Sequence, residues 1–346
     1  MHQPADAVRS IDIFGIPTDA GASCRGDGMG PEALRVAGLL DTLAALGHTV
    51  SDHGDIVWHE RPAPNAQSPW RLSTERQADV LALAAQSCQR AQASLQAGHL
   101  PVFLGGDHSL SMGTLGGVAR HCAEIGKPLF VLWVDAHGDF NTPETSTTGN
   151  LHGMPLALLC GEPDFGPEFD GPWRGAIDPR NVTIFGARSI DRPERTLLEA
   201  RGVDVMDMRR IDEMGAVALM RGVIERVEAV DGHLHVSLDV DVMDPSIAPG
   251  AGTPVAGGLT FREGHLAMEM LHDSGCVSSV DIVELNPFLD HAGMSARLLV
   301  DLAASLFGRQ IMARSPMRGT GFTGLASGAA PYSRQGATIT AAGRQQ

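Results

Sequence analysis

The run Leu129–Val134 is apolar at every position, and three potential metal ligands follow it within five residues. A strand that is apolar on both faces is typical of a parallel sheet covered by helices on both sides. This strand would end at the sequence Asp135-Ala-His137-Gly-Asp139. On an extended backbone, residues two apart point the same way, so the three side chains are expected to converge. Two carboxylates and an imidazole suit a divalent cation better than an apolar core.

Short apolar runs of β-type composition alternate with longer helical segments along the chain. This alternation predicts a three-layer α/β/α fold with a parallel sheet of about eight strands. We expect a single domain over residues 9–310, a disordered N-terminus over 1–8 and a disordered tail over 311–346, where small residues dominate. The expected strands are Ile11–Ile16, Thr49–Asp52, Pro101–Leu104, Leu129–Val134, Val182–Phe185, Val203–Met206, His233–Leu238 and Val277–Val283.

The expected helices have recognisable ends. One helix is predicted from the N-cap Ser73 to Gly98, and another from Pro31 to Gly47. Two more helices are predicted at Arg262–His272 and Ala296–Phe307, and surface excursions at Arg61–Trp70 and Gly161–Arg180.

Composition limits the classes of partner. A net charge of −15 argues against nucleic acid, because phosphate contacts need clustered Lys and Arg, whereas an acidic surface attracts cationic solutes. The segment Met1–Ser10 lacks the apolar core of a signal peptide, and no apolar run approaches the roughly 20 residues that span a bilayer. The five cysteines are scattered without a Cys-x-x-Cys pair, as is typical of reduced thiols. We therefore expect a cytoplasmic protein with no nucleic-acid or membrane partner.

Acid and imidazole groups follow four of the expected strands. In open α/β sheets, sites form beyond the carboxyl ends of the strands, so these groups should share one rim. Four aspartates gathered there without cations would repel one another strongly. Glu284 follows the last strand. The candidate metal ligands are His108, Asp135, His137, Asp139, Asp239 and Asp241.

Four carboxylates and two imidazoles form a hard to borderline donor set that contains no thiolate. Mn²⁺ fits this set, with Mg²⁺, Fe²⁺ and Co²⁺ as alternatives, and a sulfur-rich structural zinc site is excluded. Six side chains are too many for one ion that keeps open positions. Two ions about 3.5–4 Å apart, bridged by carboxylates, would use them all, and the reaction class that follows is metal-assisted hydrolysis.

Three motifs look like the metal motifs of the ureohydrolase family, which contains arginases, agmatinases and related guanidino-hydrolases. They are Gly105-Gly-Asp-His-Ser109, Asp135-Ala-His-Gly-Asp139 and Ser237-Leu-Asp-Val-Asp-Val-Met-Asp-Pro245. The resemblance begins at Phe14-Gly-Ile-Pro17 and stops near Gln310. The run from Asn141 to Gly153 is similar to arginases in particular, and the predicted helix from Arg262 to Leu271 looks like bacterial arginases. The resemblance implies an arginase-like fold and a hydrolase of linear amidines, which converts L-arginine to L-ornithine and urea with a hydroxide that bridges two Mn²⁺ ions.

The resemblance also implies a role for each metal ligand. Asp135 and Asp239 look like bridging ligands. His108 and Asp139 look like further ligands of the first Mn²⁺, and His137 and Asp241 of the second. Asp139 would in addition steer the proton of the bridging hydroxide.

The same resemblance implies the substrate contacts. His152 matches a histidine that passes a proton to the leaving amine, and Glu284 matches the acid that pairs with the guanidinium. Asn141 and Thr148 match residues that hold the α-carboxylate of arginine. Asp191 and Glu194 match positions near its α-amino group. The family further implies a homotrimer or homohexamer.

Alternatives remain for individual residues and for the function. Thr148 could cap a turn, Asp191 and Glu194 could be ordinary acids at a helix N-terminus, and His152 could be a packing residue. The chain could instead be an agmatinase or guanidinobutyrase, a catalytically silent binding protein with the ureohydrolase fold, or a dinuclear phosphoesterase. Asn141 with Thr148 favours arginine, because agmatine has no carboxylate to hold.

Overall fold

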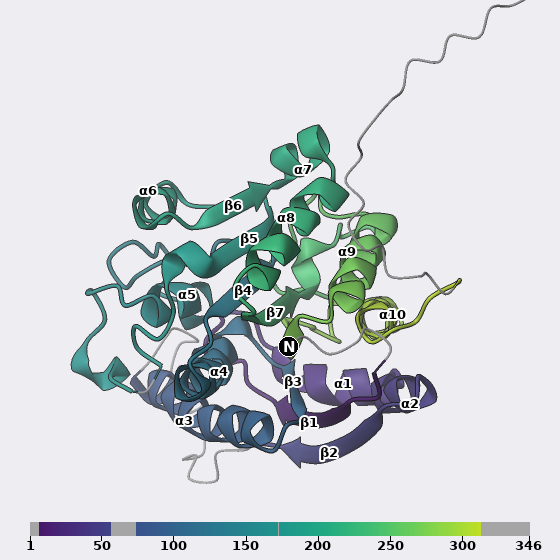
Figure 1. The fold of residues 1–346 in the computed structure, drawn as a ribbon. Helices are drawn as coiled ribbons and strands as arrows, with labels where there is room; N and C mark the ends of the chain where they lie inside the picture. The colour runs from purple at the N-terminus through teal and green to yellow at the C-terminus, as the bar shows by residue number, and fades with distance from the viewer. Residues whose placement is uncertain (1–6, 57–73, 172, 313–346) are drawn as a thin grey trace, which may run out of the picture. The chain divides into compact units, whose positions relative to one another are not determined.

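The computed structural model describes residues 7–56, 74–171 and 173–312. Eight strands in these residues form one all-parallel sheet in the order β2-β1-β3-β8-β7-β4-β5-β6 (Figure 1). All eight predicted strands are confirmed, with small shifts at their ends. They are β1 Ser10–Ile16, β2 Thr49–Asp55, β3 Leu100–Gly105, β4 Leu129–Val134, β5 Val182–Ala187, β6 Asp204–Asp207, β7 His233–Asp239 and β8 Val277–Val283.

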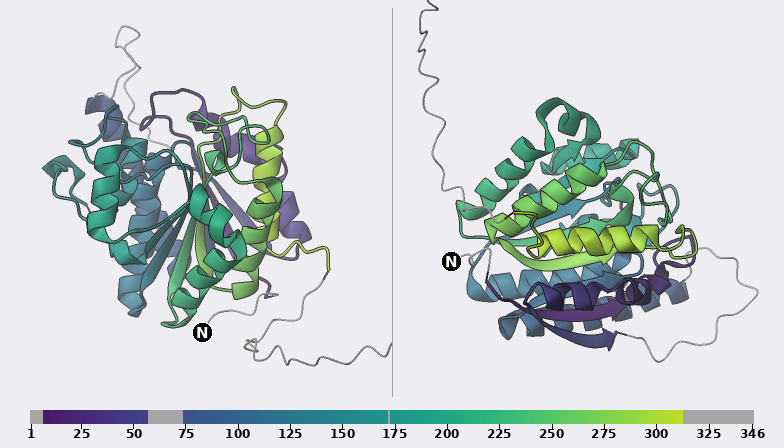
Figure 2. Two further views of the ribbon diagram at one scale, coloured as in Figure 1. Left: turned by 90° about the horizontal axis from the view of Figure 1, so that it is seen from above. Right: turned by 90° about the vertical axis from the view of Figure 1, so that its right-hand side faces the viewer.

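Helices cover both faces of the sheet, which confirms the predicted three-layer α/β/α fold (Figure 2). One face packs against α1 Gly30–Val36, α2 Leu39–Ala45, α7 Met208–Met214, α8 Ala216–Glu228, α9 Phe261–Ser274 and α10 Met294–Leu306. The other face packs against α3 Thr74–Gln96, α4 Ser111–Ile125, α5 Pro155–Leu159 and α6 Arg192–Arg201.

The position of β4 inside the sheet, between β7 and β5, explains why its sequence is apolar throughout. Leu132 and Val134 belong to the core beneath one helical layer, and Val131 and Trp133 belong to the core beneath the other. Because side chains alternate along a strand, a strand covered on both faces needs apolar residues at successive positions. The apolar run Leu129–Val134 therefore reflects the burial of β4 between the two helical layers.

The single helix predicted from Pro31 to Gly47 is wrong, because the structure has two helices there. Gly38 lies between α1 and α2 with a φ of 90°, in the left-handed region that ends a helix. The turn keeps Leu34 of α1 and Leu39 of α2 in the same core.

The segment 161–180 is more than a surface excursion. It buries Phe165, Phe169, Trp173 and Ile177 against the core on the α3–α6 side. A Cβ on Gly116 of α4 would lie 2.7 Å from the Trp173 Cβ, so the glycine permits this close packing.

Several predictions concern residues outside the described ranges. Ser73 and the segment 61–70 are among them, as are 1–6 and 313–346 of the two predicted disordered termini. In the part of the chain that is described, no helix is both long and apolar enough to cross a membrane.

Candidate active site

The candidate ligands lie at the carboxyl edge of the sheet, beyond neighbouring strands. His108 follows β3 in a short 3-10 helix, His108–Leu110. Asp239 is the last residue of β7, and Asp241 lies in the 3-10 helix Val240–Val242 that follows. Glu284 directly follows β8. Because β3, β8, β7 and β4 are adjacent in a parallel sheet, their carboxyl ends bring these distant residues together.

A first group of ligands surrounds His108. Its Nδ1 atom lies 3.2 Å from Asp135 Oδ2, 3.1 Å from Asp139 Oδ2 and 3.2 Å from Asp239 Oδ2. His108 and Asp135 are completely buried, and the other two carboxylates nearly so. This is the set that the resemblance implied for one ion.

A second group surrounds His137. Its Nδ1 atom lies 3.0 Å from Asp241 Oδ2 and 3.4 Å from Asp135 Oδ1. Asp135 therefore faces both groups with different oxygens. Asp239 faces the first group, and its Oδ1 accepts a hydrogen bond from the Asp241 backbone N–H at 2.8 Å.

The backbone that joins the two groups is not the extended one expected from the sequence. β4 ends at Val134, and Asp139 has a φ of 48°. The Asp135 side chain accepts a hydrogen bond from the His137 N–H at 2.6 Å, which bends the loop. A Cβ on Gly138 would lie 2.7 Å from Glu194 Oε1. The loop therefore sends Asp139 toward His108 and His137 toward Asp241, instead of all three side chains to one point.

The donor set fits divalent cations. His108 Nε2 is hydrogen-bonded to Ser237 Oγ at 2.7 Å, which turns Nδ1 toward three carboxylates. Nδ1 is buried and makes no hydrogen bond within the described residues. Burial, with repulsion from Asp135, raises the pKa of Asp139 to about 6. Burial and the neighbouring Asp241 raise the pKa of Asp239 well above its usual range. A cation would bind the imidazole nitrogen and neutralise this repulsion.

Two residues that the sequence analysis missed support the first group. The Trp133 ring stacks on the His108 ring with centroids 3.9 Å apart, and its Nε1–H donates to Asp135 Oδ2 at 2.9 Å. Ser237 fixes the other nitrogen of His108. Ser237 lies two residues before Asp239 on β7, and Trp133 lies on β4 two residues before Asp135, which directly follows that strand, so strand periodicity would have identified both as neighbours of the site.

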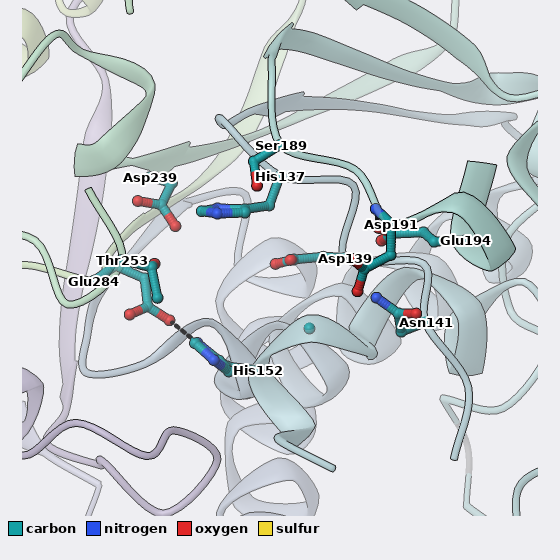
Figure 3. Close-up of a pocket in the computed structure, with 11 residues that line it drawn as sticks. His137, Asp139, Asn141, His152, Ser189, Asp191, Glu194, Asp239, Thr253 and Glu284 are labelled. Carbon is teal, nitrogen blue, oxygen red and sulfur yellow. Dashed lines mark hydrogen bonds and ion pairs between the residues drawn. The ribbon is translucent and has the colours of Figure 1, made fainter. Parts of the chain in front are cut away.

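Glu284 and His152 form a hydrogen-bonded pair beside these groups (Figure 3). His152 Nδ1 lies 2.9 Å from Glu284 Oε1, which also accepts the His108 backbone N–H at 2.6 Å. Burial lowers the pKa of His152, but the Glu284 carboxylate outweighs burial and raises this pKa to about 9. Glu284 Oε2 is buried without a hydrogen-bond partner in the described residues. The pair therefore offers an unused carboxylate oxygen and a proton held on His152.

A pocket connects the ligand groups to the other predicted substrate residues. In Figure 3, Asp239, His137 and Glu284 lie toward one end, and Asn141, Asp191 and Glu194 toward the other. The lining residues are His137, Asp139, Asn141, His152, Gly153, Ser189, Asp191, Glu194, Asp239, Thr253 and Glu284.

Asp191 and Glu194 have a structural role at the far end of this pocket. They form the capping box of α6. Glu194 Oε1 accepts the Phe140 N–H at 2.9 Å, and Oε2 accepts the Asp191 N–H at 3.2 Å. Burial raises the pKa of Glu194 to about 7. Both acids thus shape the pocket wall as well as starting the helix.

The two residues expected at the α-carboxylate are placed differently. Asn141 lines the pocket, and its Oδ1 accepts a hydrogen bond from Thr145 Oγ1 at 3.0 Å. Thr148 is exposed and is not part of the pocket lining. Its hydroxyl accepts the Asn150 N–H at 3.2 Å, as in a turn.

Thr253 lines the pocket, although the sequence analysis gave it no role. Its Oγ1 donates to Asp241 Oδ2 at 3.2 Å. Thr253 lies in the loop after the 3-10 helix Val240–Val242. The residue types around it do not by themselves indicate a metal-binding or substrate-binding residue. Only the return of this loop to the pocket identifies it.

The fold and the site define a class: parallel α/β proteins with a candidate dinuclear metal centre at the carboxyl edge of the sheet. Residues 9–308 match the model of the Arginase family, and the chain belongs to this family. It is 48% identical over 314 residues to an arginase of Agrobacterium fabrum, covering 90% of this chain and 95% of that protein. It is 50% identical over 307 residues to an arginase of Brucella melitensis, covering 87% of this chain and 97% of that protein. The native arginase structure from Bacillus caldovelox superposes with a TM-score of 0.80 at 39% identity, covering 88% of this chain and all of that one.

Proposed function

We propose that this chain is a manganese-dependent hydrolase that converts L-arginine and water to L-ornithine and urea. The relatives named above are arginases, and the match covers nearly their whole length. The observation that carries the proposal is the position of the unpartnered Glu284 Oε2 in the pocket beside two carboxylate–imidazole groups.

Two Mn²⁺ ions would be held by the two ligand groups. His108, Asp135, Asp139 and Asp239 would hold one, and Asp135, His137, Asp239 and Asp241 the other. When bound, such ions supply Lewis acidity and a water that ionises near neutral pH. Asp139 lines the pocket as well, and its carboxylate would steer the proton of that water.

The protein's own residues would bind the guanidinium and move a proton. Glu284 Oε2 would accept N–H donors of the planar cation, which a carboxylate matches geometrically. Water adds to the guanidinium carbon, and the bond from that carbon to the ornithine nitrogen breaks. His152 would hold a proton and donate it to this departing amine. A cationic substrate is also favoured because its charge reduces the repulsion among the carboxylates of the pocket.

The far end of the pocket would bind the α-carbon substituents. Asn141, with an amide in the pocket wall, would hold the carboxylate together with Thr148 from the adjoining loop. Asp191 and Glu194 would face the ammonium group. The alternative is a guanidino-hydrolase for agmatine or guanidinobutyrate, whose substrates lack one of these groups.

The experiment is a urea-release assay with Mn²⁺ on arginine, agmatine and guanidinobutyrate in parallel. We expect arginine to be turned over in strong preference to the other two. Turnover of agmatine without turnover of arginine would contradict the assignment.

We propose that residues 9–310 are the catalytic domain and that the protein is a cytoplasmic homotrimer or homohexamer, as the family resemblance implies. Light scattering on the purified full chain measures the subunit number directly.

A further inference from the structure

Arg188 directly follows β5, and its guanidinium donates hydrogen bonds to backbone carbonyl oxygens. There are five of these carbonyls, which belong to Gly186, Asp241, Val242, Met243 and Val255. The shortest of these hydrogen bonds are 2.6 Å, to Asp241 O, and 2.7 Å, to Val255 O. Within the described residues, no carboxylate lies at ion-pair distance from this half-buried cation.

The contacts of Arg188 join three loops at the carboxyl edge of the sheet. Its side chain holds the turn after β7 and the loop that contains Val255. Its backbone N–H donates to Ala136 O at 2.8 Å, and the next N–H, of Ser189, donates to the same oxygen at 3.0 Å. Ala136 belongs to the loop after β4. One residue therefore connects the loops after β4 and β7 and the loop at Val255.

Two of these loops carry groups that face the Asp241 carboxylate, and the third, after β7, carries Asp241 itself. Its Oδ2 lies 3.0 Å from His137 Nδ1 and accepts a hydrogen bond from Thr253 Oγ1 at 3.2 Å. Its Oδ1 accepts the Ala136 N–H at 3.1 Å. Arg188 therefore binds the backbone of Ala136 and Asp241, the two residues that form the Ala136 N–H to Asp241 hydrogen bond. It also binds the carbonyl of Val255, two residues from Thr253.

The chemistry of the site requires arginine and not another cation. The guanidinium has five N–H donors in a fixed plane, which can bind several carbonyls at once, whereas a lysine offers three donors on one atom. The neighbouring residue is adapted to it, because a Cβ on Gly258 would lie 2.6 Å from Arg188 Nη2. The carbonyl cage and this glycine together fit a planar group.

We propose that Arg188 is a positioning residue that holds the Asp241 carboxylate against His137, and so sets the affinity of one of the two cation sites. The inference rests on the proposed metal pair. Residues that orient metal ligands typically contribute about 10–100-fold to metal affinity. Without Arg188, the Asp241 turn is free to move away from His137, while the group around His108 keeps its own supports in Trp133 and Ser237.

The experiment is calorimetric titration of the metal-free full chain with Mn²⁺, together with metal analysis, for native protein, Arg188→Met and Arg188→Lys. We expect two sites in the native protein, and an increase of about 10–100-fold in the Kd of one site only in Arg188→Met. Arg188→Lys should weaken the same site by a smaller factor. Arg226→Met is the matched control, because Arg226 bonds Thr183 and Asp204 at the outer strands and should leave both sites unchanged.

The outcomes separate the two proposals. Native protein that binds fewer than two Mn²⁺ ions contradicts the proposed metal pair. Two sites in native protein with equal affinities in folded Arg188→Met contradict the role of Arg188, as does equal weakening of both sites. If Arg188→Met does not fold, Arg188→Lys decides, and native-like affinity at both sites in that variant overturns the inference.

Discussion

His152 Nδ1 lies 2.9 Å from Glu284 Oε1, and the same oxygen accepts the His108 backbone N–H at 2.6 Å. One carboxylate oxygen is therefore occupied by the protein, and the other, Oε2, is left for a ligand. The Glu284 carboxylate thus supports the fold with one oxygen and offers the other to the pocket.

Glu284→Gln should lower kcat/KM for arginine by at least about 100-fold, because a buried guanidinium that loses its carboxylate partner costs about 3–5 kcal/mol. The glutamine carbonyl oxygen can still accept the His108 N–H. Mn²⁺ content should therefore stay at the native level, and a parallel loss of metal would show that Glu284 acts on the metal centre instead.

Trp133→Phe should weaken Mn²⁺ binding by about 10–100-fold while preserving the fold, because phenylalanine keeps a ring against His108 but cannot donate to Asp135. Titration of the metal-free variant measures the change. Trp173→Phe is the control, since the Trp173 Nε1–H donates to Phe169 O in the segment 161–180. Equal affinities in the two variants would contradict a role for the Trp133 hydrogen bond.

Asp239→Ala should lose Mn²⁺ and activity together, because its carboxylate faces His108 Nδ1 and lines the pocket. In metal-free protein, the same substitution removes one of several buried carboxylates that repel one another. The metal-free variant should therefore melt no lower than metal-free native protein, whereas native protein gains about 4 kcal/mol when Mn²⁺ is a thousandfold above its Kd. Thermal melts with and without chelator test this, and full activity in a verified variant would refute the assignment.

Asp12 should make the stability of the protein fall at acid pH. Its carboxylate bonds His53 at 3.0 Å, His99 at 3.1 Å and Ser94 at 2.7 Å. Burial raises the pKa of Asp12, but these hydrogen bonds outweigh burial and hold the pKa below its usual value. A lowered folded pKa adds stability above the unfolded pKa of about 4, and this stability is lost as pH falls through the folded value.

Asp12→Asn should therefore lower the free energy of unfolding by roughly 1–3 kcal/mol at pH 7 and by less near pH 3. Urea midpoints at the two pH values measure the difference. A penalty that is equal at both, or larger at pH 3, would show that the charge of Asp12 is not the stabilising feature.

Asn141→Ala should raise KM for arginine more than Thr148→Ala does, because Asn141 lines the pocket and Thr148 lies on an exposed turn. Steady-state assays of both variants compare the two. A larger effect of Thr148→Ala would mean that the loop moves toward the substrate when it binds.

Local chemistry in the sequence determined much of this molecule. Apolar runs such as Leu129–Val134 identified the strands, because burial on both faces requires apolar residues at successive positions. Hard ligands directly after those runs identified the edge of the sheet where the site lies, since parallel strands share one carboxyl edge. The helix break at Gly38 was missed, because a glycine within a helical pattern of apolar residues does not by itself show that the helix ends there. The turn follows from the packing of both helices against one core.

The tertiary structure decided how these ligands are divided and supported. Asp139 turns toward His108 in a positive-φ conformation, and Gly138 packs closely against Glu194, which lies in the first turn of α6. Arg188 binds carbonyls more than fifty residues away in the chain, and no sequence motif marks a carbonyl as a partner. Residue types and strand ends follow from local periodicity, whereas the direction of a side chain in a loop depends on contacts between segments that only folding brings together.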